Sequence, residues 1–173
     1  MQIVECEFPV TSVLDRRVVE MASFRDSYRA PFHHPNATVV DIFFAIFGHR
    51  PSWMNWALLI RNRIAVACGL DAPSTTELLD IQPKPFYCVG DKIGPWPIFA
   101  LMPNELVAGR NNKHLDFRLS IFKEKNCEAC STVISTVCTV HNRAGKIYLF
   151  FIVPFHKWGV KQLIRRSIVE GRL

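Results

Sequence analysis

The stretch HLDFRLS, at residues 114–120, carries side chains of types that could hold a ligand. Successive side chains of an extended strand point to opposite faces, so the pattern puts His114, Asp116, Arg118 and Ser120 together on one face. If that face lines a cavity, Asp116 and Arg118 form a fixed charged pair that could orient the polar head of a ligand. The same alternation is typical of an antiparallel strand with one face in water, and the sequence leaves both interpretations open.

Two histidines are predicted at the ends of elements, His141 at the close of a strand and His156 at the start of the last helix. A histidine that acts as a general acid or base usually has a second group that holds its tautomer. Asp116 and Asp91 are candidates for that second group, although sequence separation says nothing about distance in space. The alternative is that each histidine is a structural hydrogen-bonding group without a catalytic role.

Cys127 and Cys130 form a C-x-x-C pair, a pattern found in zinc sites and in redox proteins. A zinc site needs two more ligands, and the sequence has no second C-x-x-C and no H-x-x-H pair. Residues i and i+3 of a strand also point to opposite faces, which is unsuitable for chelation. We therefore expect no metal and no cofactor. Motifs for a nucleophile elbow, a phosphate-binding loop or a dinucleotide fold are likewise absent from the sequence.

The 173 residues suit one domain, residues 1–173, with an ordinary globular composition of 49% hydrophobic and 21% charged residues. The net charge of +6 permits an anionic partner without requiring one. Glu5 and Glu7 occupy the place where a secretory signal would be basic, and no run approaches the roughly 18 apolar residues of a spanning helix. We expect a soluble, cytoplasmic protein with reduced cysteines and no membrane insertion.

Two helices are predicted in the N-terminal half, after an edge strand at residues 2–8 and a helical turn at residues 18–24. Thr38 is an N-cap for the first of these helices, which ends at Gly48. Arg61, on the second helix, is either a ligand anchor in a cavity or a surface charge. The second helix spans residues 53–68 and has an apolar stripe at steps of three and four residues: Trp53, Trp56, Ile60, Ile64 and Ala67.

Five strands are predicted in the C-terminal half, joined by turns so short that they form an antiparallel meander. They lie at residues 97–102, 106–110, 115–123, 129–141 and 146–153. A helix at residues 155–170 follows directly, and a sheet that runs into a helix lays it back across itself to cover both apolar faces. The predicted fold class is α+β: a helix-grip in which an antiparallel sheet meander wraps around a long C-terminal helix, with two further helices in the N-terminal half. The inward residues of the last helix are predicted to be Phe155, Trp158, Leu163, Ile164 and Ile168.

The strand predicted at residues 146–153, which includes Tyr148, is apolar on both faces. Both faces then need cover, which the N-terminal helices or a homodimer could supply. The outer face of the last helix could meet phosphates or an anionic bilayer, or it could simply be solvated. No aromatic residue is interleaved there to stack on bases, so we expect no nucleic-acid partner. Its basic residues are Lys157, Lys161, Arg165 and Arg166.

The segments VGDKIGPW, HLDFRLS, TVHNRAGKIYL and VPFHKW occur in this order, with RNRIAVACGL upstream. Together they resemble an uncharacterised bacterial family known as a domain of unknown function, over residues 25–166. That family is grouped with the START-like (SRPBCC) helix-grip superfamily, which includes lipid-transfer domains, polyketide cyclases and the birch-pollen allergen class. The resemblance implies a cavity between the sheet and the C-terminal helix.

Three hypotheses for the function remain open, because a fold does not decide among them. The first is a binding domain that holds a small hydrophobic or amphipathic molecule in a cavity under the last helix. The second is a cyclase- or isomerase-type enzyme that uses a His or Asp in that cavity. The third is an interaction module with a filled core. The candidate ligand-binding residues are Arg61, Asp91, His114, Asp116, Arg118, His141, Tyr148, His156 and Trp158.

Overall fold

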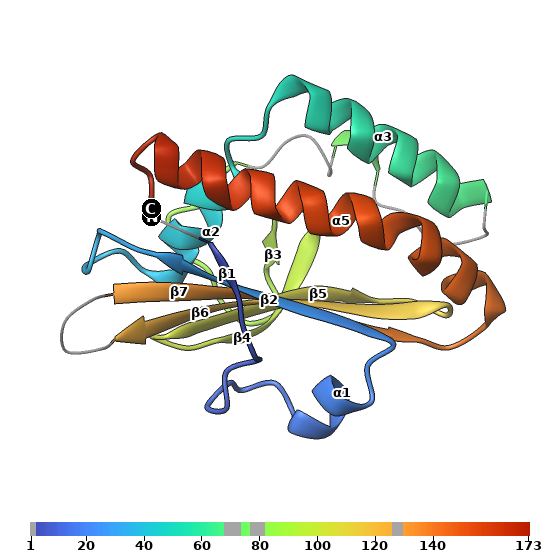
Figure 1. The fold of residues 1–173 in the computed structure, drawn as a ribbon, viewed down its shortest axis with the longest axis horizontal. Coiled ribbons are helices and arrows are strands. Elements are labelled where there is room, and N and C mark those ends of the chain that lie inside the picture. The colour runs from blue at the N-terminus through green and yellow to red at the C-terminus, as the bar shows by residue number, and fades with distance from the viewer. Residues whose placement is uncertain (1–2, 68–73, 77–81, 126–129) are drawn as a thin grey trace.

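A seven-stranded antiparallel sheet forms the centre of the computed structural model, in the order β1-β2-β7-β6-β5-β4-β3 (Figure 1). The structure describes residues 3–67, 74–76, 82–125 and 130–173. The strands are β1 Val4–Glu5, β2 Phe24–Pro31, β3 Lys92–Ile93, β4 Trp96–Leu101, β5 Glu105–Asn111, β6 Leu115–Lys125 and β7 Cys130–Val140. The helices are α1 Arg16–Glu20, α2 Val39–Phe47, α3 Ser52–Ala67 and α5 Arg143–Val169.

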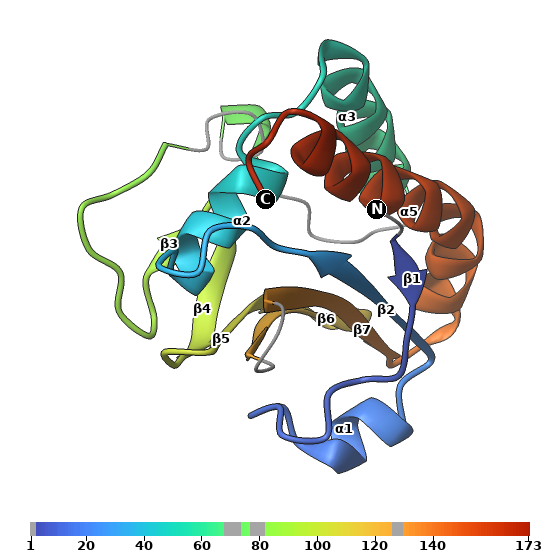
Figure 2. The same ribbon diagram turned by 60° about the vertical axis from the view of Figure 1, so that its left-hand side comes forward.

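The helices lie on both sides of this sheet. Figures 1 and 2 show α5 crossing one face, with α3 outside it and α2 under its C-terminal end, while α1 lies against the opposite face. The predicted α+β class, the antiparallel hairpins from β4 to β7 and the long C-terminal helix are therefore confirmed. The connection from β6 to β7, which includes Cys127, lies outside the described residues.

The prediction of a strand at residues 146–153 is wrong, because these residues form the first half of α5. Apolar side chains at nearly every position give neither a period of 2 nor a period of 3.6, so the pattern could not decide between strand and helix. The local signal is Asn142, whose side chain caps the helix by accepting from the Gly145 amide at 3.1 Å. A Cβ at Gly145 would lie 2.4 Å from the His114 carbonyl oxygen, so this close approach needs a glycine.

The sequence did not reveal β2, since a helical turn was predicted at residues 18–24. The structure ends α1 at Glu20 and pairs β2 with β7 over eight residues, from Phe24 with Cys138 to Pro31 with Ser131. The strand buries the side chains of Asp26, Ser27 and Tyr28, each with a polar group, which is unusual for a central strand. The edge strand was predicted at residues 2–8, and among residues 3–8, which the structure describes, only Val4–Glu5 forms a ladder with β2.

The helix α2 has the predicted ends. Thr38 and Asp41 form a capping box, and Gly48 is the C-cap. Its buried residues form one core with the sheet and with the C-terminal half of α5, where Leu163 and Ile164 are 6% and 0% exposed. Because side chains alternate along each strand, the core residues mark the helix-facing side of the sheet: Tyr28, Ala30, Leu106, Ala108, Leu119, Ile121 and Ile134.

The opposite side of the sheet, which we call the outer face, is covered in part by the segment that precedes α1. Glu105 on β5 is fully buried there. Its carboxylate accepts hydrogen bonds from the Ser12 hydroxyl at 2.6 Å, the Val13 amide at 2.7 Å and the Ser120 hydroxyl at 2.6 Å. A buried carboxylate is tolerated when its oxygens are hydrogen-bonded, so Glu105 fastens the N-terminal segment to the sheet.

The helix α3 packs antiparallel to α5 rather than on the sheet. The rings of Trp53 and Trp158 are 4.8 Å apart at one end, and the Arg61 guanidinium lies 5.6 Å from the Tyr148 ring centroid at the other. The predicted stripe of α3 therefore does not cover the sheet, since Trp56 is 70% exposed. Two of the residues predicted to point inward from the last helix, Phe155 and Trp158, are likewise exposed, at 72% and 51%.

Candidate functional site

A cluster of three polar side chains lies between β2 and α5. Asp26 and Tyr28, two residues apart on β2, both point to the helix-facing side of the sheet. His156 lies on α5, which passes over β2 on that side. The Tyr28 hydroxyl donates to the Asp26 carboxylate at 3.0 Å, and His156 Nε2 lies 3.4 Å from the same carboxylate. The Asp26 side chain is 1% exposed and that of His156 is 21% exposed. The imidazole is therefore partly accessible to solvent, while the carboxylate that it contacts is buried.

Burial raises the pKa of two groups near this carboxylate, Tyr28 and Cys138. It raises the pKa of Tyr28 well above its usual value, and the charge of Asp26 adds to the effect, so the phenol stays a neutral donor. Burial also raises the pKa of Cys138 to about 12, which makes that thiol unreactive. Cys138 is on β7, where it pairs with Phe24 of β2. A histidine that donates Nε2–H to a carboxylate keeps its Nδ1 lone pair as a base. The cluster therefore has the parts for moving a proton at His156.

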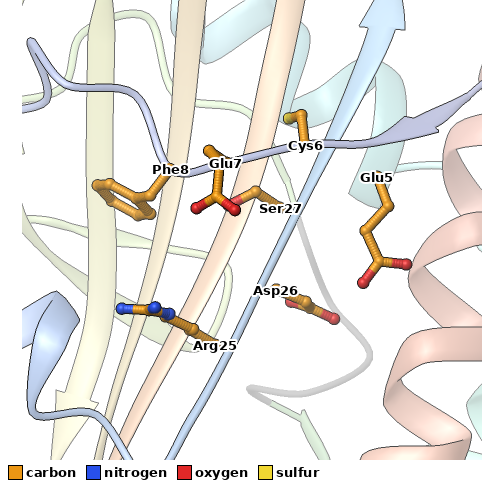
Figure 3. A pocket seen from close by; sticks show the side chains of 7 residues that line it. All are labelled: Glu5, Cys6, Glu7, Phe8, Arg25, Asp26 and Ser27. Atoms are coloured by element: carbon orange, nitrogen blue, oxygen red, sulfur yellow. The ribbon is translucent and has the colours of Figure 1, made fainter.

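A hollow of about 360 Å³ adjoins the cluster at the edge where β1 pairs with β2 (Figure 3). Figure 3 shows Glu5 and Asp26 on one side of β2, and Arg25 and Phe8 on the other. Carboxylates predominate here, but Glu5 is paired with Lys161 at 3.5 Å. The hollow is at the small end of the range for small-molecule sites. Its lining residues are Glu5, Cys6, Glu7, Phe8, Arg25, Asp26 and Ser27.

The space between the sheet and the C-terminal half of α5 is filled with side chains. Tyr28, Ile134 and Ile164 meet there, and each is at most 1% exposed. A second hollow, of about 170 Å³, lies along the segment around α1, on the other side of the sheet. Neither hollow is lined by a residue of α5, whereas the cavity was predicted between the sheet and the C-terminal helix.

The charged residues predicted on the strand 115–123 point away from α5, onto the outer face. His141 Nε2 lies 3.1 Å from the Asp116 carboxylate, so two of the predicted residues do come together. Arg118 instead lies over the Phe99 ring, 3.8 Å from its centroid, and burial lowers the pKa of its guanidinium. The His141 and Asp116 side chains are 41% and 33% exposed. This agrees better with the alternative in which the polar face of this strand lies in water than with a face that lines a cavity.

The remaining predicted residues lie in separate places. His114 Nδ1 is 3.1 Å from Asn142 Oδ1, near the start of α5. Asp91 accepts from the Cys88 amide at 2.8 Å in the turn before β3. Tyr148 is buried at the α3–α5 contact with Arg61, and Trp158 is exposed beside Trp53. A ligand role for these residues stays a prediction, as it does for Asp116, Arg118, His141 and His156.

Asp26 and Tyr28 are the residues of the polar cluster that sequence reasoning missed. The available signal was the alternation of Phe24, Asp26 and Tyr28 in FRDSYR, which would have indicated a strand with a carboxylate on its apolar face. Arg25 and Ser27 lie between them, so the segment is mostly polar and the alternation of its two faces is not obvious.

A second candidate site is the exposed surface of the two packed helices, which we call the α3–α5 apolar face. Its nine large apolar residues are between 36% and 76% exposed. On both helices they follow steps of three and four residues, so each helix presents one continuous row, and the rows meet at the Trp53–Trp158 contact. The residues of the face are Trp53, Trp56, Ile60, Ile64, Ile147, Phe150, Phe151, Phe155 and Trp158.

Charge is unevenly divided between these helices and the rest of the chain. Eight of the chain's 21 Lys and Arg residues lie on α3 and α5, together with none of its 15 Asp and Glu residues. The other elements and loops therefore hold 13 cations against 15 anions, so the net charge of +6 comes from the two helices. The cations are Arg61, Arg63, Arg143, Lys146, Lys157, Lys161, Arg165 and Arg166.

An antiparallel sheet covered on one face by a long C-terminal helix defines an α+β domain of helix-grip-like form. The family model described as "Protein of unknown function (DUF2867)" matches residues 18–163, and the chain belongs to this family. Searches of curated proteins and of solved structures found no match. Within the described ranges, no helix has the length and hydropathy needed to cross a bilayer. The same residues contain no group of three or more His, Cys, Asp or Glu side chains that could hold a metal ion.

Proposed function

We propose that this chain is an interaction domain that works through the α3–α5 apolar face. The observation that carries the proposal is the exposure of nine large apolar side chains, including three tryptophans, on two adjacent helices. Contiguous apolar surface of this kind on a soluble fold usually marks a contact with a protein or a membrane. We further propose that residues 1–173 act as one domain of START-like type whose core is filled rather than hollow.

The filled core supports an interaction domain over a carrier of apolar ligands. A carrier needs an apolar cavity of several hundred Å³, whereas Tyr28, Ile134 and Ile164 occupy the space under α5. The hollow beside β1 has three carboxylates among its lining residues, which is an unsuitable lining for a hydrophobic molecule.

Sedimentation of lysates from cells that express the tagged chain tests this proposal. We expect the wild-type chain in fast-sedimenting fractions, and the variant Trp56→Ser/Phe155→Ser in the monomer fractions with an unchanged melting temperature. The matched control is Met21→Ser/Phe86→Ser, which removes two side chains that are 80% and 85% exposed but lie off the face. Wild-type protein that sediments as a monomer, or a control that loses the association equally, would overturn the proposal.

A second candidate function has its own observation, the Asp26–His156 pair beside the 360 Å³ hollow. A histidine near a buried carboxylate is the arrangement expected of a cyclase- or isomerase-type acid–base site, and the hollow could admit a small polar or amphipathic molecule. Native mass spectrometry tests for such a molecule. An extra mass that is lost on denaturation and in Asp26→Leu, but kept in Asp116→Leu, would support this function, and a clean protein mass would contradict it.

A further inference from the structure

We infer that the α3–α5 apolar face binds an anionic lipid bilayer, with both helices lying in the interfacial layer and neither crossing it. The inference rests on the proposed function and names the partner. Three features carry it: the sign of the charge on the face, the order of residues along α5 and the choice of apolar side chains.

The sign of the charge favours an anionic partner over a second copy of this chain. The two helices carry eight cations and no acidic residue. Lys157 and Lys161 pair with Glu5, and Arg166 pairs with Glu170. Two copies that met through this face would still bring the other cations of both copies together, among them Arg143 and Arg165, and like charges across an interface disfavour association. An anionic bilayer has the opposite charge, and each Lys or Arg near its surface strengthens binding.

The order of residues along α5 matches a helix that lies flat in a membrane surface. A single exposed row at steps of three and four residues begins at Arg143, passes through Ile147, Phe151 and Trp158, and ends at Lys161 and Arg165. Its middle is apolar and both ends are cationic, so the ends can reach lipid phosphates while the middle enters the acyl boundary. The whole helix has 27 residues, or a length of about 40 Å.

The apolar side chains are those that prefer the boundary between lipid and water. Three of the chain's four tryptophans, Trp53, Trp56 and Trp158, lie on the face. Trp has an apolar body and a polar N–H, and it is enriched at the headgroup level of membranes. Figure 2 shows α3 and α5 along the same side of the molecule, with the sheet below them, so one planar surface can meet both.

Vesicle flotation gives the first test, with one lipid mixture of phosphatidylcholine alone and one with phosphatidylglycerol added. We expect the wild-type chain to float with the anionic vesicles and to remain below with the neutral ones. Binding should also weaken as salt is raised. The tryptophan emission should shift to the blue and be quenched by brominated lipid, while Trp96 stays packed in the core against Phe43 and Phe117.

The variant Arg143→Glu/Arg165→Glu tests the charge. It should weaken binding to the anionic vesicles at least about tenfold, since it reverses two cations near the lipid headgroups. The matched control, Arg17→Glu/Lys84→Glu, changes the net charge equally at exposed residues of other elements and should bind like the wild type. Trp56→Ser/Phe155→Ser should lose both binding and the blue shift, with its melting temperature unchanged.

Several outcomes would overturn the inference. They are no flotation with anionic vesicles, equal binding to neutral vesicles, or equal losses in the charge variant and its control. A wild-type dimer in light scattering that Trp56→Ser/Phe155→Ser converts to monomer would assign the face to a second copy instead. If the chain sediments fast in lysates but does not float with vesicles, the proposed interaction domain stands and the lipid partner is wrong.

Discussion

The Asp26 carboxylate and the His156 imidazole lie 3.4 Å apart, although 130 residues separate them along the chain. Two long-range contacts bring them together: the pairing of β2 with β7, and the passage of α5 over β2. The carboxylate also accepts the Tyr28 hydroxyl, so one buried acceptor fixes side chains from both the sheet and the helix.

We expect Asp26→Ala to lower the free energy of unfolding by about 1–3 kcal/mol, because it leaves the buried Tyr28 hydroxyl without its acceptor. In a Tyr28→Phe background the same change should cost about 1 kcal/mol less, since that hydroxyl is gone. Urea denaturation of the four proteins in this cycle measures the coupling. Equal costs in both backgrounds would show that the Tyr28–Asp26 bond does not contribute.

Glu105→Ala is expected to release the segment before α1. The change leaves two hydroxyls and the Val13 amide without their acceptor, at a cost on the order of 3 kcal/mol. Limited trypsin digestion at native pH should then cleave faster after Arg16 and Arg17 than in the wild type. Ser12→Ala removes one of the three donors and should have a smaller effect on the same cleavage. A rate of cleavage equal to that of the wild type in Glu105→Ala would contradict the role given to this carboxylate.

Two truncations on α5 should differ strongly in their effects. Ile164 is fully buried against the sheet, so Ile164→Ala should cost about 2–5 kcal/mol. Trp158 is 51% exposed and contacts Trp53, so Trp158→Ala should cost only about 1 kcal/mol. Thermal denaturation followed by circular dichroism measures both. A larger loss of stability for Trp158→Ala than for Ile164→Ala would mean that α5 packs against the sheet with a different face than the one that carries Ile164.

Cys138 should make the protein less stable in alkali. Burial raises its pKa to about 12 from the ordinary 9.0. Below about pH 9 the thiol is protonated in both states, but as the pH rises further the unfolded chain loses that proton first, and the free energy of unfolding falls. From about pH 9 to about pH 10, the wild type should lose about 1 kcal/mol more than Cys138→Ala. Urea denaturation under reducing conditions measures this difference, and parallel pH profiles for the two proteins would contradict the assignment.

Local signals in the sequence predicted the parts of the fold that they control. Thr38, Asp41 and Gly48 define α2, and short turns define the hairpins from β4 to β7. The prediction of a strand at residues 146–153 was wrong because a uniformly apolar segment has no hydrophobic period that separates strand from helix. There the decisive features are the Asn142 cap and the approach of Gly145 to His114, a contact between distant parts of the chain.

The candidate sites were less predictable than the fold. His156 was a predicted site residue, but its acceptor is on β2, a strand that the sequence did not reveal. The row on α3 was predicted as an apolar stripe, and its period is correct. Period alone does not say what a stripe faces: tertiary packing directs Met54 and Ala65 inward and leaves Trp56 exposed.

The division of charge between the two helices and the rest of the chain also gives the molecule a dipole moment. The positive end points outward through α3 and α5, and the remainder of the chain is slightly acidic. In the field of an anionic surface such a molecule experiences a torque, which begins to act within about one Debye length, roughly 8–10 Å, before any contact. The chain would therefore reach the surface with α3 and α5 already facing it. Ionic strength would govern how often an encounter leads to binding, while the tryptophans and phenylalanines would govern how long the bound state lasts.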